Sequence, residues 1–249
     1  MGDMLGHLVA DRTGRGWRCR LEEERVLGLS ILRAVVPAPP GLRENILRRR
    51  VYRAGERLWE QGVNRVLVEE GFPPEQWEPL RRAGLAPVES ETLCREMAAP
   101  LVLALLKRRD LDPAKSVVCL AGSCALGAMQ NAAEALSRQV GKLIIDCPGR
   151  GEVLSLWLHQ EYGLPLMQPG SVHPDVTVSF SLEKGEGADL LLCGPAPDLG
   201  GLRLVPKEGT LPEGFDALPL LAALRESGCL EREAIQAVFC LLTEEEKGL

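Results

Sequence analysis

The chain has 249 residues, of which 45% are hydrophobic and 26% are charged, a composition typical of an ordinary globular protein. Its net charge of −6 argues against general nucleic-acid binding, which depends on basic side chains that neutralise phosphates. The longest apolar run, residues 98–106, is interrupted by Pro100 and is much shorter than the roughly 20 residues of a membrane helix. The N-terminus lacks the pattern of a secretory signal. We therefore expect a cytoplasmic protein with neither a membrane nor nucleic acid as its partner.

The positions of the cysteines and histidines indicate whether the chain contains disulfides or a metal site. The eight cysteines include no Cys-x-x-Cys pair, and Cys119, Cys193 and Cys240 lie in apolar segments. This placement indicates reduced thiols used as small hydrophobic side chains rather than a disulfide framework. The chain has three histidines, and no Cys/His set has zinc-ligand spacing. We predict no metal site.

The N-terminal part, residues 1–112, is expected to be a small α/β region that begins with a β-hairpin. The alternation in residues 17–21 and the apolar segment 26–36 predict the hairpin strands, although Glu22–Glu24 make a poor turn and a helix over 21–35 is the alternative. After a proline-rich connector, the pattern predicts a helix over 41–62, a strand over 65–68, a helix over 74–83, a weak strand over 86–88 and a helix over 91–109 that Pro100 kinks or restarts.

The C-terminal part, residues 113–249, is expected to be a second domain. Uniformly apolar segments at 117–120, 143–145 and 164–167 predict buried strands, and the amphipathic segments 126–140 and 151–162 predict the helices between them, which gives a βαβαβ unit. The following connections are too short for crossover helices, so we expect strands 176–181, 188–193 and 202–205 to be antiparallel or a meander. Residues 217–225 and 231–243 predict a C-terminal helical hairpin.

A small-residue turn between the first strand and helix of this unit is the main candidate site. Residues 122–127 read Gly-Ser-Cys-Ala-Leu-Gly, and Asp146 ends the second strand. This arrangement resembles a degenerate Rossmann-type nucleotide-binding unit over residues 116–167, with Gly122 and Gly127 at the first and third glycine positions. The resemblance implies that Gly122 and Gly127 line a phosphate, that the third glycine packs the helix on the strand, and that Asp146 holds a ribose. Cys124 stands where that pattern has its middle glycine.

Three neighbouring side chains leave alternatives open. Arg150, in the loop after Asp146, favours a 2′-phosphate if it contacts the ligand and is otherwise a solvated loop residue. Cys124, expected at a helix N-terminus, is a candidate reactive thiol. Ser123 fits a loosened nucleophile elbow, but no convincing triad can be written from the acidic residues and histidines that follow it.

We interpret the chain as an α/β protein, a Rossmann-like βαβαβ unit extended by antiparallel strands and preceded by a smaller α/β region. Its layout is similar to the two-lobed enzymes of the shikimate dehydrogenase kind, a likeness of architecture that implies no activity. The first functional hypothesis is a binding or interaction module without catalysis, whose partner is a nucleotide or another protein. The alternatives are a nucleotide-dependent or NAD(P)-dependent oxidoreductase with its site at the 122–127 turn, and a thiol-based sensor that uses Cys124. The sequence assigns neither a catalytic residue nor a particular cofactor.

Overall fold

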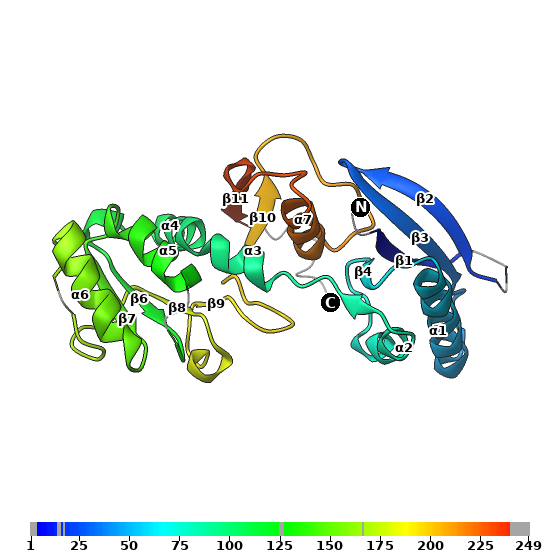
Figure 1. Cartoon of the computed structure of the whole chain (residues 1–249), viewed down its shortest axis with the longest axis horizontal. Coiled ribbons are helices and arrows are strands. Elements are labelled where there is room, and N and C mark those ends of the chain that lie inside the picture. Colours follow the sequence, from blue (N-terminus) through cyan, green and yellow to red (C-terminus); the bar gives the residue numbers. More distant parts are fainter. Residues whose placement is uncertain (1–3, 14–15, 17, 125–126, 166, 240–249) are drawn as a thin grey trace. The chain divides into compact units, whose positions relative to one another are not determined.

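The computed structural model describes residues 4–13, 16, 18–124, 127–165 and 167–239, and it contains two compact units (Figure 1). The first unit comprises residues 1–89 and 208–231, and the second comprises residues 90–207 and 232–249. Within the described residues, no helix is both long and apolar enough to cross a membrane. The fold class is α/β, as predicted.

The first unit is built on a mixed sheet with the strand order β2-β3-β1-β4-β5. Strand β1 lies at its centre and is parallel to both β3 and β4, β4 is parallel to β5, and β2 is antiparallel to β3. The strands are β1 (Leu5–Asp11), β2 (Arg20–Val26), β3 (Leu29–Pro37), β4 (Arg65–Val68) and β5 (Ala86–Pro87).

The predicted hairpin is present as β2 and β3, but its turn lies elsewhere. Leu27 and Gly28 connect the two strands, with φ of 48° and 94°. Positive φ at both central residues is what a two-residue hairpin turn with the right twist requires. The three glutamates that made a poor turn therefore lie inside β2, at the edge of the sheet.

Strand β1 was not predicted, although it is the central strand of the first unit. Gly6 and His7 interrupt its apolar pattern, and both are explained by packing. A Cβ atom at Gly6 would lie 3.0 Å from a methyl group of Val63 and 3.2 Å from one of Leu58. The glycine therefore lets helix α1 and the following loop approach the sheet closely.

The predicted helices of the first unit are confirmed. In α1, the side chains of Val51, Ala54 and Leu58 are buried in the core of the first unit, while Arg49 and Arg53 are exposed. The helices are α1 (Glu44–Glu60), the 3₁₀ turn η1 (Pro74–Gln76), α2 (Trp77–Arg82) and α7 (Ala217–Glu226).

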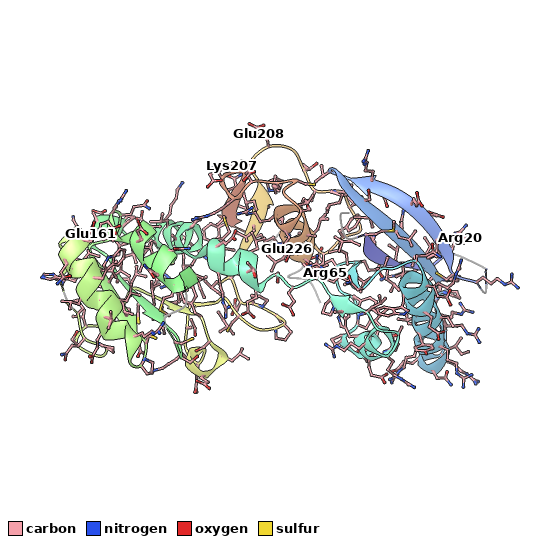
Figure 2. All side chains as sticks on the ribbon, in the orientation of Figure 1. Arg20, Arg65, Glu161, Lys207, Glu208 and Glu226 are labelled. Carbon is pink, nitrogen blue, oxygen red and sulfur yellow. The ribbon has the colours of Figure 1, made fainter. Side chains whose placement is uncertain are left out.

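The units are bounded differently from the expected domains 1–112 and 113–249, because residues 208–231 pack on the first unit. Asp216 donates its backbone N–H to the carbonyl oxygen of Val68, at an N···O distance of 2.9 Å. Arg65 and Glu226 form an ion pair of 2.6 Å, and both are labelled in Figure 2. Helix α7 therefore belongs to the first unit, although it follows most of the second unit in the chain.

The second unit contains a parallel sheet with the order β7-β6-β8-β9, and Met167 adds a parallel bridge to Ile144 of β7. The strands are β6 (Val117–Ala121), β7 (Lys142–Asp146), β8 (Val176–Ser179) and β9 (Leu190–Leu191). The helices are α3 (Glu91–Glu96), α4 (Ala98–Arg108), α5 (Gly127–Ser137) and α6 (Arg150–Tyr162), with 3₁₀ turns η2 (Pro113–Lys115) and η3 (Leu182–Lys184).

Two predictions for the second unit need correction. The strand expected over 164–167 is a single bridge at Met167. Strands β8 and β9, expected to be antiparallel or a meander, are parallel to β6 and to each other, because the short turn η3 and its flanking loop replace a crossover helix. The helix expected over 91–109, with a kink or restart at Pro100, is confirmed: it restarts at Ala98, which places Pro100 in the first turn of α4, where proline is tolerated.

The expected C-terminal helical hairpin is half correct. Its first helix is α7, but residues 235–239 form the strand β11 (Ile235–Phe239), which is antiparallel to β10 (Leu202–Pro206). Ile235, Val238 and Phe239 suit a paired strand better than a solvated helix, and the strand packs beside α4. Residues 240–243 of the predicted helix lie outside the described residues.

His7 is a buried titratable group at the centre of the first sheet, with an exposed fraction of 2%. Its Nε2 lies 3.0 Å from the carbonyl oxygen of Gly214, and its ring stacks on Phe215 at a centroid distance of 3.7 Å. Burial lowers the pKa of His7 to about 4, the Gly214 hydrogen bond raises it by less, and the Arg33 charge lowers it further. At neutral pH the ring is therefore uncharged, and Nε2–H donates to Gly214.

This burial predicts a pH-dependent stability. The unfolded chain takes up a proton at His7 near pH 6.5, whereas the folded chain does so only near pH 4. The free energy of unfolding should therefore fall as the pH drops through this interval, by roughly 3 kcal/mol. His7→Phe keeps a ring against Phe215 and should remove this part of the pH dependence in urea denaturation. An unchanged pH dependence in the variant would assign the effect to another group.

Candidate functional site

The carboxyl ends of β6, β7 and β8 form one edge of the second sheet, which we call the carboxyl edge. From β6 the chain passes through α5 to β7 on one side, and later reaches β8 on the other side. Strand β6 is therefore a topological switch point, and the connections that leave its end diverge. In open parallel sheets, ligands bind in the crevice that such a divergence opens.

Gly122 follows β6 directly and is held by both backbone and packing. Its N–H donates to the carbonyl oxygen of Asp146 at 3.0 Å, which ties the end of β6 to the end of β7. A Cβ atom at this position would lie 2.7 Å from the methyl carbon of Met129 in α5. A glycine is thus required here for α5 to pack against the sheet.

The remainder of the turn presents two exposed polar side chains, Ser123 and Cys124. Residues 125 and 126 lie outside the described residues. Gly127 begins α5, and a Cβ atom built on it would meet no atom of the residues that the structure describes within 4 Å. The predicted role of Gly127 in packing helix on strand is therefore wrong, and Gly122 performs that role instead.

Asp146 lies at the carboxyl edge, where the prediction placed it, but it has a partner that sequence reasoning missed. The ammonium group of Lys184, in η3, lies 3.0 Å and 3.3 Å from the two carboxylate oxygens. About a third of each side chain is exposed, 32% for Asp146 and 38% for Lys184. The edge thus carries one paired carboxylate and one ammonium group, both open to solvent.

Lys184 could not be found by its motif, because it belongs to none. It reaches Asp146 since β8 is parallel to β6, so that the connection leaving β8 starts at the same edge as β7 ends. Lys184 could have been located if β8 had been predicted to be parallel to β6. The short connection after β8 led instead to the prediction of an antiparallel strand or a meander.

Neither Arg150, the remaining candidate residue, nor the acidic residue Asp175 forms a hydrogen bond or an ion pair with Asp146 or Lys184 in the part of the chain that the structure describes. Arg150 is the first residue of α6 and is exposed, after Gly149 with a φ of 71°. Asp175 accepts a hydrogen bond from the backbone N–H of Val117 at 2.8 Å, which is a structural role at the opposite end of β6. Among the described residues, no group of three or more His, Cys, Asp or Glu side chains could hold a metal ion.

Cysteines cluster beneath this edge. The pKa of Cys119 is raised to about 11, chiefly by burial and also by the Asp146 charge, while the Lys184 charge opposes this shift. Cys147 is buried after β7, and its pKa is raised by burial first, then by the charges of Cys124 and Asp146. Cys124 is the exposed member of this group.

Comparison with known proteins finds no matching family and weak similarities among solved structures. No family model matches the chain, and no curated protein matches it. Among solved structures, it is similar to L-tryptophan dehydrogenase from Nostoc punctiforme, at 11% identity and a TM-score of 0.30 over 71% of this chain and 56% of that one. It is also similar to a shikimate 5-dehydrogenase-like protein, at 12% identity and a TM-score of 0.26 over 72% of this chain and 66% of that one. The chain thus spans less than two thirds of either protein.

Proposed function

We propose that the chain is a nucleotide-binding protein, with the ligand at the carboxyl edge of the second sheet. The observation that carries this proposal is the strand order β7-β6-β8, which makes β6 a switch point directly before the Gly122 turn. Phosphates would lie at the start of α5, where backbone N–H groups are free of helical partners.

The open space at Gly127 supports this placement. Among the described residues, a Cβ atom at Gly127 would have no neighbour within 4 Å, so packing there does not require a glycine. A bare backbone at the first residue of α5 does, however, let a phosphate approach the N–H groups closely.

Asp146 and Lys184 would contact the sugar portion of the ligand. The Asp146 carboxylate can accept hydrogen bonds from ribose hydroxyls, as the acidic residue at the end of this strand does in dinucleotide-binding units. Lys184 adds a cation 3.0 Å away, which suits a ligand that carries a phosphate on or near the ribose.

We further propose a binding role without catalysis. Asp146 is neutralised by Lys184 and is therefore poorly suited to act as a general base. A nicotinamide-dependent oxidoreductase would use the same nucleotide site. One assay distinguishes such an enzyme from a protein that only binds the nucleotide. If the protein oxidises NADH or NADPH in the presence of a carbonyl substrate, as measured by the loss of nicotinamide absorbance, it is an oxidoreductase.

Nucleotide binding can be tested by thermal shift with NADH, NADPH, ADP-ribose, ATP and S-adenosylmethionine. A ligand at about 100 times its Kd should stabilise the fold by about 2.7 kcal/mol. Gly127→Ala should leave the melting temperature of the free protein unchanged or slightly higher, because its methyl group meets no atom, and should weaken binding at least about tenfold.

Asp146→Ala should abolish the ligand-induced shift, whereas Lys184→Met, which removes the proposed phosphate contact, should weaken the binding of NADPH more than that of NADH. Both variants break the same half-exposed ion pair, which contributes at most about 1 kcal/mol to stability, but only the first removes the carboxylate. Glu161→Ala, on the exposed face of α6 and labelled in Figure 2, should bind like the parent. Nucleotide shifts that survive both Gly127→Ala and Asp146→Ala would move the site elsewhere, and no shift with any nucleotide would refute the proposal.

Thiol labelling tests the same edge independently and addresses the sensor hypothesis. Iodoacetamide should modify the exposed Cys124 and Cys229 first, whereas Cys94 and Cys119, whose pKa values burial raises to about 12 and about 11, should react only on unfolding. A saturating nucleotide should protect Cys124 and leave Cys229 reactive, as followed by peptide mass spectrometry. Equal labelling of Cys124 with and without nucleotide would contradict a ligand at this turn.

A further inference from the structure

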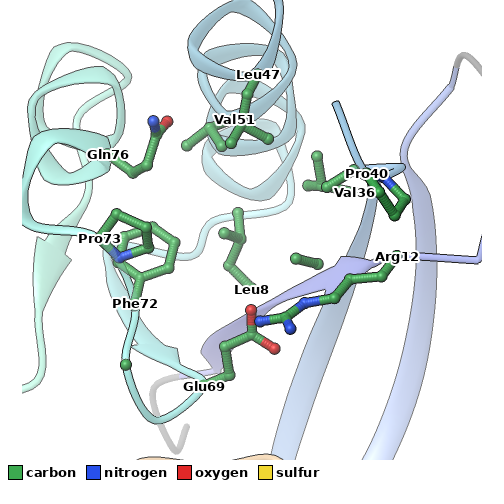
Figure 3. A pocket seen from close by; sticks show the side chains of 13 residues that line it. Leu8, Arg12, Val36, Pro40, Leu47, Val51, Glu69, Phe72, Pro73 and Gln76 are labelled. Atoms are coloured by element: carbon green, nitrogen blue, oxygen red, sulfur yellow. The ribbon is translucent and has the colours of Figure 1, made fainter. Parts of the chain in front are cut away.

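The first unit contains a cavity of about 390 Å³ at the carboxyl ends of its parallel strands (Figure 3). Its walls come from the ends of β1, β3 and β4, from α1 and from the segment that enters η1. The residues that line it and enter the argument are Leu8, Arg12, Val36, Val51, Glu69 and Gln76. The volume lies within the range of about 300–1,000 Å³ that is typical of small-molecule sites.

The topology explains why a cavity opens here. In the order β3-β1-β4, strand β1 lies between two parallel neighbours, and the chain leaves β3 through α1 to reach β4 on the far side of β1. The end of β1 is therefore a second switch point, independent of the one in the second unit. Ligand sites in open parallel sheets occur at such positions.

The deep part of the cavity is apolar. Leu8, Val36 and Val51 belong to the hydrophobic core of the first unit and are 1–2% exposed, and the partly buried Phe72 packs against the same core. These side chains would contact the hydrocarbon body of a ligand rather than a sugar or a phosphate.

Gln76 is the polar exception on the wall. It is 2% exposed, and its Oε1 has no hydrogen-bond partner among the described residues. Buried polar atoms are nearly always satisfied, so an orphaned carbonyl oxygen beside a cavity calls for a ligand that donates an N–H or O–H.

Opposite charges stand on another side of the same cavity. Arg12 extends from the end of β1 and Glu69 follows β4, and in Figure 3 both lie well away from the Gln76 amide. Neither side chain takes part in an ion pair within the described part of the chain. A guanidinium group suits a carboxylate, and a carboxylate suits an ammonium group.

We propose that this cavity binds a free α-amino acid with a bulky apolar side chain that ends in a hydrogen-bond donor. Arg12 holds the carboxylate, Glu69 holds the ammonium group, the apolar wall surrounds the side chain, and Gln76 Oε1 accepts from its far end. The site lies wholly in the first unit and does not depend on nucleotide binding by the second.

Isothermal titration of the full chain with a set of matched ligands tests the proposal. L-Tryptophan and L-tyrosine, whose side chains end in N–H and O–H donors, should bind saturably and at least about tenfold more tightly than L-phenylalanine, which lacks a donor. Tryptamine lacks the carboxylate and indole-3-propionate lacks the ammonium group, so both should bind more weakly than L-tryptophan.

Single variants assign each contact. Arg12→Gln should weaken L-tryptophan about tenfold or more while leaving tryptamine unchanged, and Glu69→Gln should do the same while leaving indole-3-propionate unchanged. Glu70→Gln removes the neighbouring exposed carboxylate, which does not line the cavity, and should bind like the parent. Gln76→Leu should erase the preference for L-tyrosine over L-phenylalanine.

The ligand series keeps the test decisive if a buried variant such as Gln76→Leu fails to fold. Absence of binding by every amino acid would overturn the proposal. So would equal affinity for L-tryptophan, tryptamine and indole-3-propionate, because the cavity would then recognise only an apolar body.

Discussion

Parallel pairing of neighbouring strands is the constraint on which both units depend. Parallel strands cannot be joined by a tight turn, so the chain must cross from the end of one strand back to the start of the next. All carboxyl ends of parallel strands then meet at one edge, and their connections leave that edge in two directions from the central strand. In the first unit this strand is β1, and in the second it is β6. Each proposed site lies at such an edge, although the two units differ in size and in their connections.

Much of the architecture could be predicted because burial leaves a periodic trace in the sequence. The stripe on α1, the uniformly apolar β6 and the hairpin of β2 and β3 were all recognised in this way. Strand β1 was missed because it contains Gly6 and His7, two residue types that are common in loops. In the structure, Gly6 allows α1 to pack closely on the strand, and burial keeps His7 uncharged. The direction of β8 and β9 was missed since η3 is shorter than an ordinary crossover.

The candidate site was only partly predictable for a related reason. Gly122 and Asp146 follow strands whose pairing the pattern implied, and the backbone hydrogen bond between them joins the two positions. Lys184 reaches Asp146 from the end of a third strand, β8, whose direction could not be predicted from the sequence. The division of labour between the glycines was likewise invisible, because it depends on where the Met129 side chain lies. Pairwise contacts between distant segments are thus what the pattern of a single sequence lacks.

The return of residues 208–231 to the first unit has a consequence for synthesis on the ribosome. Helix α7 is made only after β6, β7, β8 and β9 have emerged, and β11, which pairs with β10 of the second unit, is made later still. The usual order, in which an N-terminal domain folds before the next one appears, is therefore unavailable to this chain. The face of the first sheet that carries His7 remains exposed until Gly214 and Phe215, which cover it in the folded protein, have been synthesised. The first unit is complete only once α7 has been made and the second only once β11 has been made, and so the two finish folding almost together.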